Sequence, residues 1–135
     1  MNTDASVPLV QVLARRAAVS VRASDRERAE FMTAATEAAT NIVRHATHGV
    51  VVLRAFVGPP AQLEFEAWDE GPGIPDPEAA LADGFSRGRQ LEVDQSRANG
   101  MGCGFGTMRR FMDYLTLESG PQGTRVRAQK RVGER

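Results

Sequence analysis

Small apolar side chains recur at helical spacing across residues 26 to 46, and this run does most to define the fold. Its predicted buried stripe consists of Phe31, Ala34, Ala35, Ala38 and Ile42. Ser24 and Asp25 precede the run as typical N-cap residues, and Gly49 follows it as a stop signal. A second run with helical spacing covers residues 6 to 22, through Val10, Leu13, Ala14, Ala17 and Val21. The sequence therefore predicts two consecutive helices in its first third.

Two pairs of strands are predicted from alternating or β-branched runs. Residues 50–57 and 62–68 flank a Gly-Pro-Pro turn, and the second of these runs alternates like a half-buried strand. Residues 114–119 and 124–132 flank a Gly-Pro-Gln-Gly turn. Between the pairs, residues 107–113 are predicted to be helical, with Met108, Phe111 and Met112 facing inward.

These elements predict an α+β fold. We expect a two-layer sandwich in which about three helices pack on one face of a mixed, mostly antiparallel sheet. A length of 135 residues is typical of one domain, so residues 1–135 are expected to form a single unit.

Composition excludes several classes of function. The 17 basic and 17 acidic side chains cancel, which argues against a general nucleic-acid or membrane-surface binder. No apolar run approaches the roughly 18 residues of a membrane span, and the first ten residues lack the basic start of a signal peptide, so we expect a cytoplasmic protein. The lone Cys103 argues against a disulfide framework or a cysteine-based zinc site. Lys130 is the only lysine, which argues against a P-loop or a catalytic lysine.

Three polar or glycine-rich groups could carry chemistry, the first of them on the long helix. Glu37, Asn41 and His45 are spaced i, i+4, i+8 and share one stripe, which Thr33 extends. Asn41 is a poor helix former and could offer a neutral oxygen to a metal. The alternative is a helix face that is simply solvated.

The other two groups are loops. Asp69 ends a strand in W-D-E-G-P-G-I-P, where Gly71 and Gly73 would let the backbone approach a flat ligand closely. The alternative is an aspartate-initiated turn. Residues 100–106, G-M-G-C-G-F-G, precede a helix and suit phosphate binding by backbone N–H groups, the alternative being a loose surface loop. Their spacing fits neither the dinucleotide-binding fingerprint nor a P-loop.

Taken in order, E-A-A-T-N-I-V-R-H-A, D-E-G-P-G-I and G-M-G-C-G-F-G resemble the N, G1 and G2 boxes of the GHKL (Bergerat-fold) ATPases. At this length the chain is similar to the anti-sigma-factor serine/threonine kinases, and most to the stressosome switch kinases of the RsbT type. The resemblance covers roughly residues 27 to 131.

The resemblance implies a site for ATP or ADP with Mg²⁺. Glu37 would be the general base, Asn41 would ligate Mg²⁺, and Asp69 would bind the adenine amino group. Thr124 would add a hydrogen bond near the adenine. Residues 84–99 would form a lid that brings an arginine to the phosphates. The remaining implied contacts are Gly71, Gly73 and Ile74 at the base, Arg87 (or Arg89 or Arg97) in the lid, and Gly100, Gly102, Gly104 and Gly106 at the phosphates.

The implied function is phosphorylation of a STAS-domain partner in stress signalling. A binding module is the alternative, which would hold a sigma factor or switch on a PP2C-type phosphatase without phosphotransfer. A third possibility is a degenerate fold that no longer binds nucleotide. No nucleic-acid or membrane partner is expected.

Overall fold

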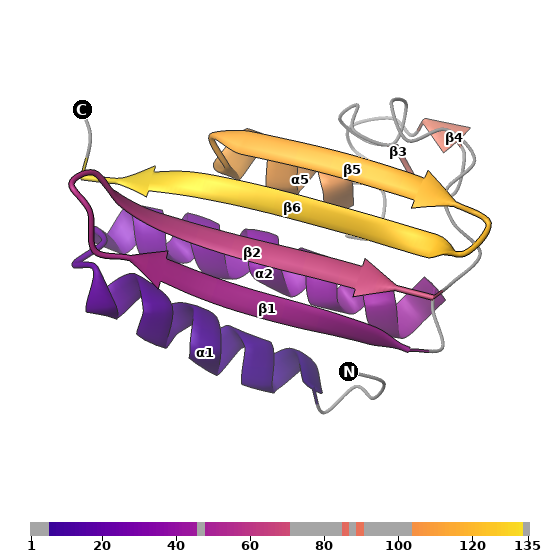
Figure 1. Cartoon of the computed structure of the whole chain (residues 1–135), viewed down its shortest axis with the longest axis horizontal. Helices are drawn as coiled ribbons and strands as arrows, with labels where there is room; N and C mark the ends of the chain where they lie inside the picture. Colours follow the sequence, from indigo (N-terminus) through magenta and orange to yellow (C-terminus); the bar gives the residue numbers. More distant parts are fainter. Residues whose placement is uncertain (1–5, 46–47, 71–84, 87–88, 91–103, 134–135) are drawn as a thin grey trace.

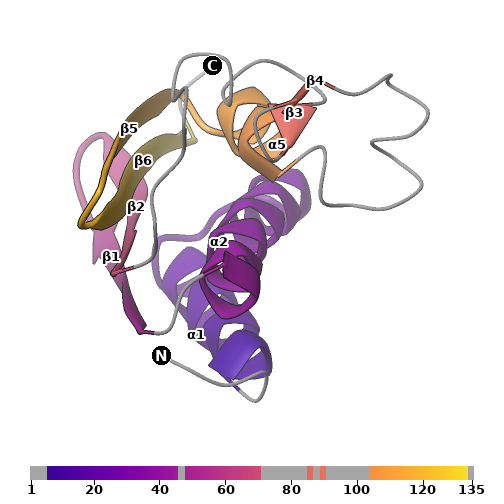
Figure 2. The same ribbon diagram turned by 90° about the vertical axis from the view of Figure 1, so that its right-hand side faces the viewer.

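The computed structural model describes residues 6–45, 48–70, 85–86, 89–90 and 104–133. These residues form two layers, a four-stranded antiparallel sheet and three helices that cover one of its faces (Figures 1 and 2). The predicted α+β sandwich is therefore confirmed.

The helices are α1 (Ser6–Ser20), α2 (Asp25–His45) and α5 (Gly104–Phe111). The main sheet consists of β1 (Gly49–Phe56), β2 (Ala61–Asp69), β5 (Tyr114–Gly120) and β6 (Gly123–Val132), in the order β1-β2-β6-β5. The short strands β3 (Phe85–Ser86) and β4 (Arg89–Gln90) pair with each other, and β3 contacts α5.

A capping box begins α2 at the predicted position. Ser24 Oγ accepts a hydrogen bond from Glu27 N at 3.1 Å, and Glu27 Oε1 accepts one from Ser24 N at 2.8 Å. This reciprocal pair satisfies two backbone donors that a helix start leaves unpaired. From this start α2 runs between α1 and α5 and contacts both of them (Figure 2).

The core lies between α2 and the two central strands. Each member of the predicted α2 stripe is buried, and the rings of Phe31 and Phe65 lie 6.2 Å apart between centroids. Met108 on α5 is fully buried, Met112 is buried and Phe111 is half-buried. Leu13 departs from the pattern: it is 41% exposed, because the buried side of α1 follows Val10, Ala14 and Ala18 instead.

The expectation of a half-buried second strand is wrong for β2. Leu63 to Ala67 are all buried, including Glu64 and Glu66 on the face away from the helices. Arginine side chains from the neighbouring strands cover these carboxylates. Arg54 Nη1 lies 2.7 Å from Glu64 Oε1 and 3.1 Å from Glu66 Oε1.

Arg125 on β6 binds the same face. Its Nε donates to Glu66 Oε2 at 3.0 Å, and this bond, with that of Arg54, holds the pKa of the Glu66 carboxyl below its usual value. The guanidinium also lies 6.0 Å from the ring centroid of Trp68. The solvent-facing side of the sheet thus carries glutamate and arginine side chains that pair across neighbouring strands, whereas the side that packs on the helices is mainly apolar.

Candidate functional site

A row of polar residues crosses one end of the sheet. The strand register pairs Gly49 with Asp69, Asp69 with Thr124, and Thr124 with Ser119. Asp69 lies on the helix-facing side, because side chains alternate along β2 and Phe65 and Ala67 on that side are buried against the helices. Sequence positions 69 and 124 are thus brought next to each other.

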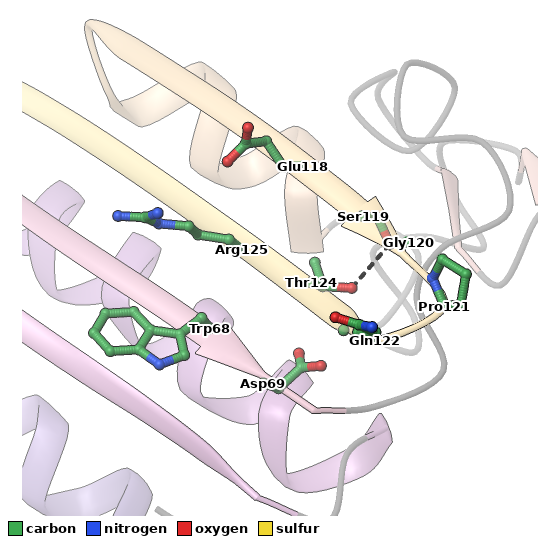
Figure 3. Close-up of a pocket in the computed structure, with 10 residues that line it drawn as sticks. Trp68, Asp69, Glu118, Ser119, Gly120, Pro121, Gln122, Thr124 and Arg125 are labelled. Atoms are coloured by element: carbon green, nitrogen blue, oxygen red, sulfur yellow. Dashed lines mark hydrogen bonds between the residues drawn. The ribbon is translucent and has the colours of Figure 1, made fainter.

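Thr124 is held by a second hydroxyl in this row. Ser119 Oγ and Thr124 Oγ1 lie 3.0 Å apart across the β5–β6 turn, as Figure 3 shows. Ser119 was not predicted from the sequence, although its spacing from Thr124 across a glycine-containing turn indicates that the two hydroxyl groups can meet. The pair fixes the position of the Thr124 hydroxyl near the Asp69 strand end.

Two glycines make this end of the sheet compact. A Cβ on Gly123 would lie 1.9 Å from the carbonyl oxygen of Asp69, and the φ angle of Gly123 is 145°. A Cβ on Gly49 would lie 2.4 Å from Cγ2 of Ile42 on α2. The last turns of α2 therefore lie directly against the row that contains Asp69.

This packing brings the long-helix candidates to the same end of the molecule. Asn41 precedes Ile42, and its Nδ2 atom is buried without a hydrogen-bond partner among the described residues. Glu37, one turn earlier, is half-buried, whereas Thr33 is exposed. The backbone of His45 ends α2, but its side chain lies outside what the structure describes. A merely solvated helix face does not account for the buried amide, because an unpaired buried polar group costs about 1–3 kcal/mol.

The helix α5 begins three residues earlier than predicted. Gly104 and Gly106 lie in its first turn, where backbone N–H groups lack partners within the helix. The other residues expected at the site fall outside the described residues: Gly71, Gly73, Ile74, Arg87, Arg97, Gly100 and Gly102, with most of the lid at 84–99. The backbone of Arg89 lies in β4.

A hollow of about 640 Å³ lies where β2 ends beside the β5–β6 turn (Figure 3). It is lined by Trp68, Asp69 and residues 118–125, which include Thr124. Its size is in the range of small-molecule sites. Trp68, Glu118 and Arg125 of this lining lie on the solvent-facing side of the sheet, whereas Asp69 and Thr124 lie on the helix-facing side. Glu37 and Asn41 are not part of the lining, so the hollow is not itself the space between α2 and the strand end.

The donor set around Asn41 fits a magnesium ion that is held mainly by phosphate oxygens. No group of three or more His, Cys, Asp or Glu side chains within the described ranges could hold a metal by itself. Mg²⁺ is usually bound by one or two protein oxygens, water and substrate phosphates. The Asn41 amide, whose nitrogen has no hydrogen-bond partner among the described residues, fits such a role, and its oxygen would be the protein ligand.

The chain matches a known protein family over most of its length. Residues 2–130 match the model of the histidine kinase-like ATPase domain. The chain belongs to this family. Its relatives include an anti-sigma F factor of Caldanaerobacter subterraneus subsp. tengcongensis, with 39% identity over 111 residues, covering 79% of this chain and 72% of the relative. The Thermoanaerobacter sp. strain X514 anti-sigma F factor is 37% identical with the same coverage.

A kinase is among the relatives as well. The serine/threonine-protein kinase RsbT of Bacillus subtilis strain 168 is 29% identical over 130 residues, covering 95% of this chain and 90% of that protein. These matches place the chain in the anti-sigma-factor branch of the family, as the resemblance implied.

Solved structures confirm the fold. The sensor histidine kinase MprB of mycobacteria superposes with a TM-score of 0.54 at 19% identity, over 78% of this chain and 72% of that one. The histidine kinase domain of a blue-light activated kinase from Erythrobacter litoralis gives a TM-score of 0.52 at 22% identity, over 78% of this chain. The match spans 47% of the length of that second chain. Among the described helices of the present protein, none has the length and apolar character needed to cross a bilayer.

Proposed function

We propose that this protein is an ATP-dependent serine/threonine protein kinase of the anti-sigma regulatory type, which phosphorylates a STAS-domain partner in the cytoplasm. The packing of Ile42 on Gly49 carries the proposal, because it brings Asn41 on α2 to the strand end that holds Asp69 and Thr124. In this proposal, two motifs that are far apart in the sequence contribute to one site.

Each side of the site has a distinct task in this proposal. Asp69 accepts a hydrogen bond from the exocyclic amine of adenine, and Thr124, held by Ser119, adds a second polar contact near the base. The remaining contacts to the adenine base would come from Gly71, Gly73 and Ile74. Because Gly123 has no side chain, the backbone of β6 can lie close to Asp69 at the adenine side of the site.

The phosphates would lie toward the helices. The first turn of α5, with Gly104 and Gly106, offers unpaired N–H groups and the positive end of the helix dipole. Gly100, Gly102 and Arg87 of the lid would add further donors. Asn41 would hold Mg²⁺ through its amide oxygen, and a bound Mg²⁺ neutralises charge on the transferred phosphoryl group.

Phosphotransfer then needs one proton acceptor. The serine or threonine hydroxyl oxygen of the partner forms a bond to the γ-phosphorus, the bond from that phosphorus to the β,γ-bridging oxygen breaks, and ADP leaves. Glu37 takes the hydroxyl proton. Its half-buried place one turn before Asn41 on α2 keeps it on the same side of the helix as the proposed metal ligand.

The anti-sigma F factors among the relatives favour a second candidate function. In it, the chain binds nucleotide and sequesters a sigma factor, or activates a PP2C-type phosphatase, with no need for phosphotransfer. The two functions are compatible in one protein.

The deciding experiment is transfer of labelled γ-phosphate from Mg·ATP to a panel of STAS-domain proteins. We expect Glu37→Gln to lower the rate at least about 10²-fold while ATP binding persists, because general-base catalysis contributes about 10²–10⁴-fold. Thr33→Ala, one turn earlier on the same helix and exposed, is the matched control and should keep the wild-type rate.

Two results would change the proposal. A Glu37→Gln protein with the wild-type rate removes Glu37 as the base. A wild-type protein that binds ATP and a partner but transfers no phosphate favours the docking function.

A further inference from the structure

Lys130, the only lysine of the chain, is buried on the helix-facing side of the sheet. It pairs in register with Leu63, and its neighbours on that side of β6, Ala128 and Val132, are buried apolar residues. Its exposed fraction is 7%. An ammonium group in this place is costly unless it is paired, so its contacts indicate what it does.

Lys130 connects α2 and α5 through its ammonium group. Its Nζ donates to Glu30 Oε1 on α2 at 2.8 Å and to the carbonyl oxygen of Phe111 at 2.7 Å. Phe111 is the last residue of α5, where carbonyl groups lack partners within the helix and a positive charge is favourable. The hydrogen bond from Lys130 also lowers the pKa of the Glu30 carboxyl.

Both partners of Lys130 belong to helices that carry residues of the candidate site. Glu30 lies two helical turns before Glu37 on α2, so the two carboxylates share one side of that helix. The helix α5 has eight residues and is about 12 Å long, with Gly104 at its start. A helix this short behaves as a rigid rod, so a constraint on Phe111 at its end also constrains the position of Gly104.

Other contacts already hold the end of α5 on β6. Asp113 N donates to the carbonyl oxygen of Gln129 at 2.9 Å, and Arg131 N donates to Asp113 Oδ2 at 2.6 Å. These bonds do not reach α2, so the charged link to Glu30 is what Lys130 adds. A buried ion pair is often no more stabilising than an apolar residue of similar volume, which makes overall stability a weak explanation for it.

We propose that Lys130 is a positioning residue that fixes the first turn of α5 relative to α2 and so sets how tightly the site holds the phosphate groups of a nucleotide. The inference rests on the proposed function, since it assumes that α5 receives the phosphates. Lys130 acts through α5 and touches no part of the nucleotide. The adenine side of the site, at Asp69 and Thr124, does not depend on it.

The test compares a ligand with phosphates to one without. Calorimetric titration of the full chain with adenosine and with Mg·ATP gives the ratio of the two dissociation constants for each variant. We expect Lys130→Met to reduce the advantage of ATP over adenosine about tenfold, or about 1.4 kcal/mol, with adenosine affinity unchanged within about twofold. Arg127→Met, a cation on the opposite face of the same strand, is the control and should leave the ratio unchanged.

If Lys130 were only structural, Lys130→Met would lower the affinities for adenosine and for Mg·ATP by the same factor, or change neither. An unchanged ratio of the two dissociation constants in a folded Lys130→Met protein therefore overturns the proposal. If Lys130→Met does not fold, Glu30→Gln decides in the same way, because it removes the charge but keeps a hydrogen-bond acceptor of the same shape. Its ratio should fall about threefold. If the wild-type protein binds neither ligand, the nucleotide function itself fails, and the role of Lys130 fails with it.

Discussion

Gly123 offers a sharp test of how the strand end is built. Its φ of 145° is strained for a residue with a side chain, and an added Cβ would lie 1.9 Å from the carbonyl oxygen of Asp69. Because the obstacle is backbone rather than a flexible side chain, the strand end has to move. We therefore expect Gly123→Ala to destabilise the fold and to displace Asp69 from the candidate site.

The magnitude follows from two terms. A strained backbone conformation costs about 1–3 kcal/mol, and overpacking costs a further 1–3 kcal/mol, so we expect about 4 kcal/mol in total. With an unfolding entropy of about 2.1 cal/mol/K per residue over 135 residues, this lowers the melting temperature by about 14 °C. Urea denaturation, followed by circular dichroism, measures the free energy directly.

Gly120→Ala is the matched control at the other end of the same turn. A Cβ there would meet no atom within 4 Å, so its effect should stay within about 0.5 kcal/mol. A Gly123→Ala protein with a melting temperature within about 2 °C of Gly120→Ala would refute the close approach of β6 to Asp69.

Two further predictions concern packing and pH. Gly49→Ala should lower the unfolding free energy by about 1–3 kcal/mol, because the added Cβ would clash with Cγ2 of Ile42. Ile42→Leu removes that methyl group and should recover part of the loss in a double-mutant cycle measured by urea denaturation. Strictly additive effects of the two substitutions would contradict the contact. The hydrogen bond from Arg125 lowers the pKa of the Glu66 carboxyl, so this pair stabilises the folded state above the ordinary pKa of 4.5, and the stabilisation is lost as pH falls through the folded-state pKa. Glu66→Gln should therefore reduce the fall in melting temperature between pH 5 and pH 2. A variant whose melting temperature depends on pH as steeply as that of the wild type would contradict this pairing.

Local patterns in the sequence were enough to predict most elements. Ser24 and Glu27 form their capping box within four residues, and the alanine stripe of α2 is a property of one helix. Both can therefore be predicted from residue spacing within one segment of the sequence. The two hairpins were equally accessible, because each turn contains glycine and joins two runs of strand-forming residues.

The burial of charged residues could not be predicted in this way. Glu66 is buried because arginines from two other strands cover it, and Lys130 is buried because α2 and α5 supply its partners. Both depend on which strands become neighbours, which the alternation of one strand does not reveal. The pairing of Asp69 with Thr124 is also long-range, and before the strand register was known only the family resemblance implied that these two residues lie close together.

The most direct test of the account is a thermal-shift titration with ATP and ADP, with and without Mg²⁺. At about 100 times its dissociation constant a ligand stabilises the folded state by about 2.7 kcal/mol, which corresponds to about 10 °C for a chain of this length. We predict a Mg²⁺-dependent shift of this size in the wild type and in the exposed control Thr33→Ala, and its loss in Asn41→Ala. No shift with any adenine nucleotide in the wild-type protein would contradict the proposed function.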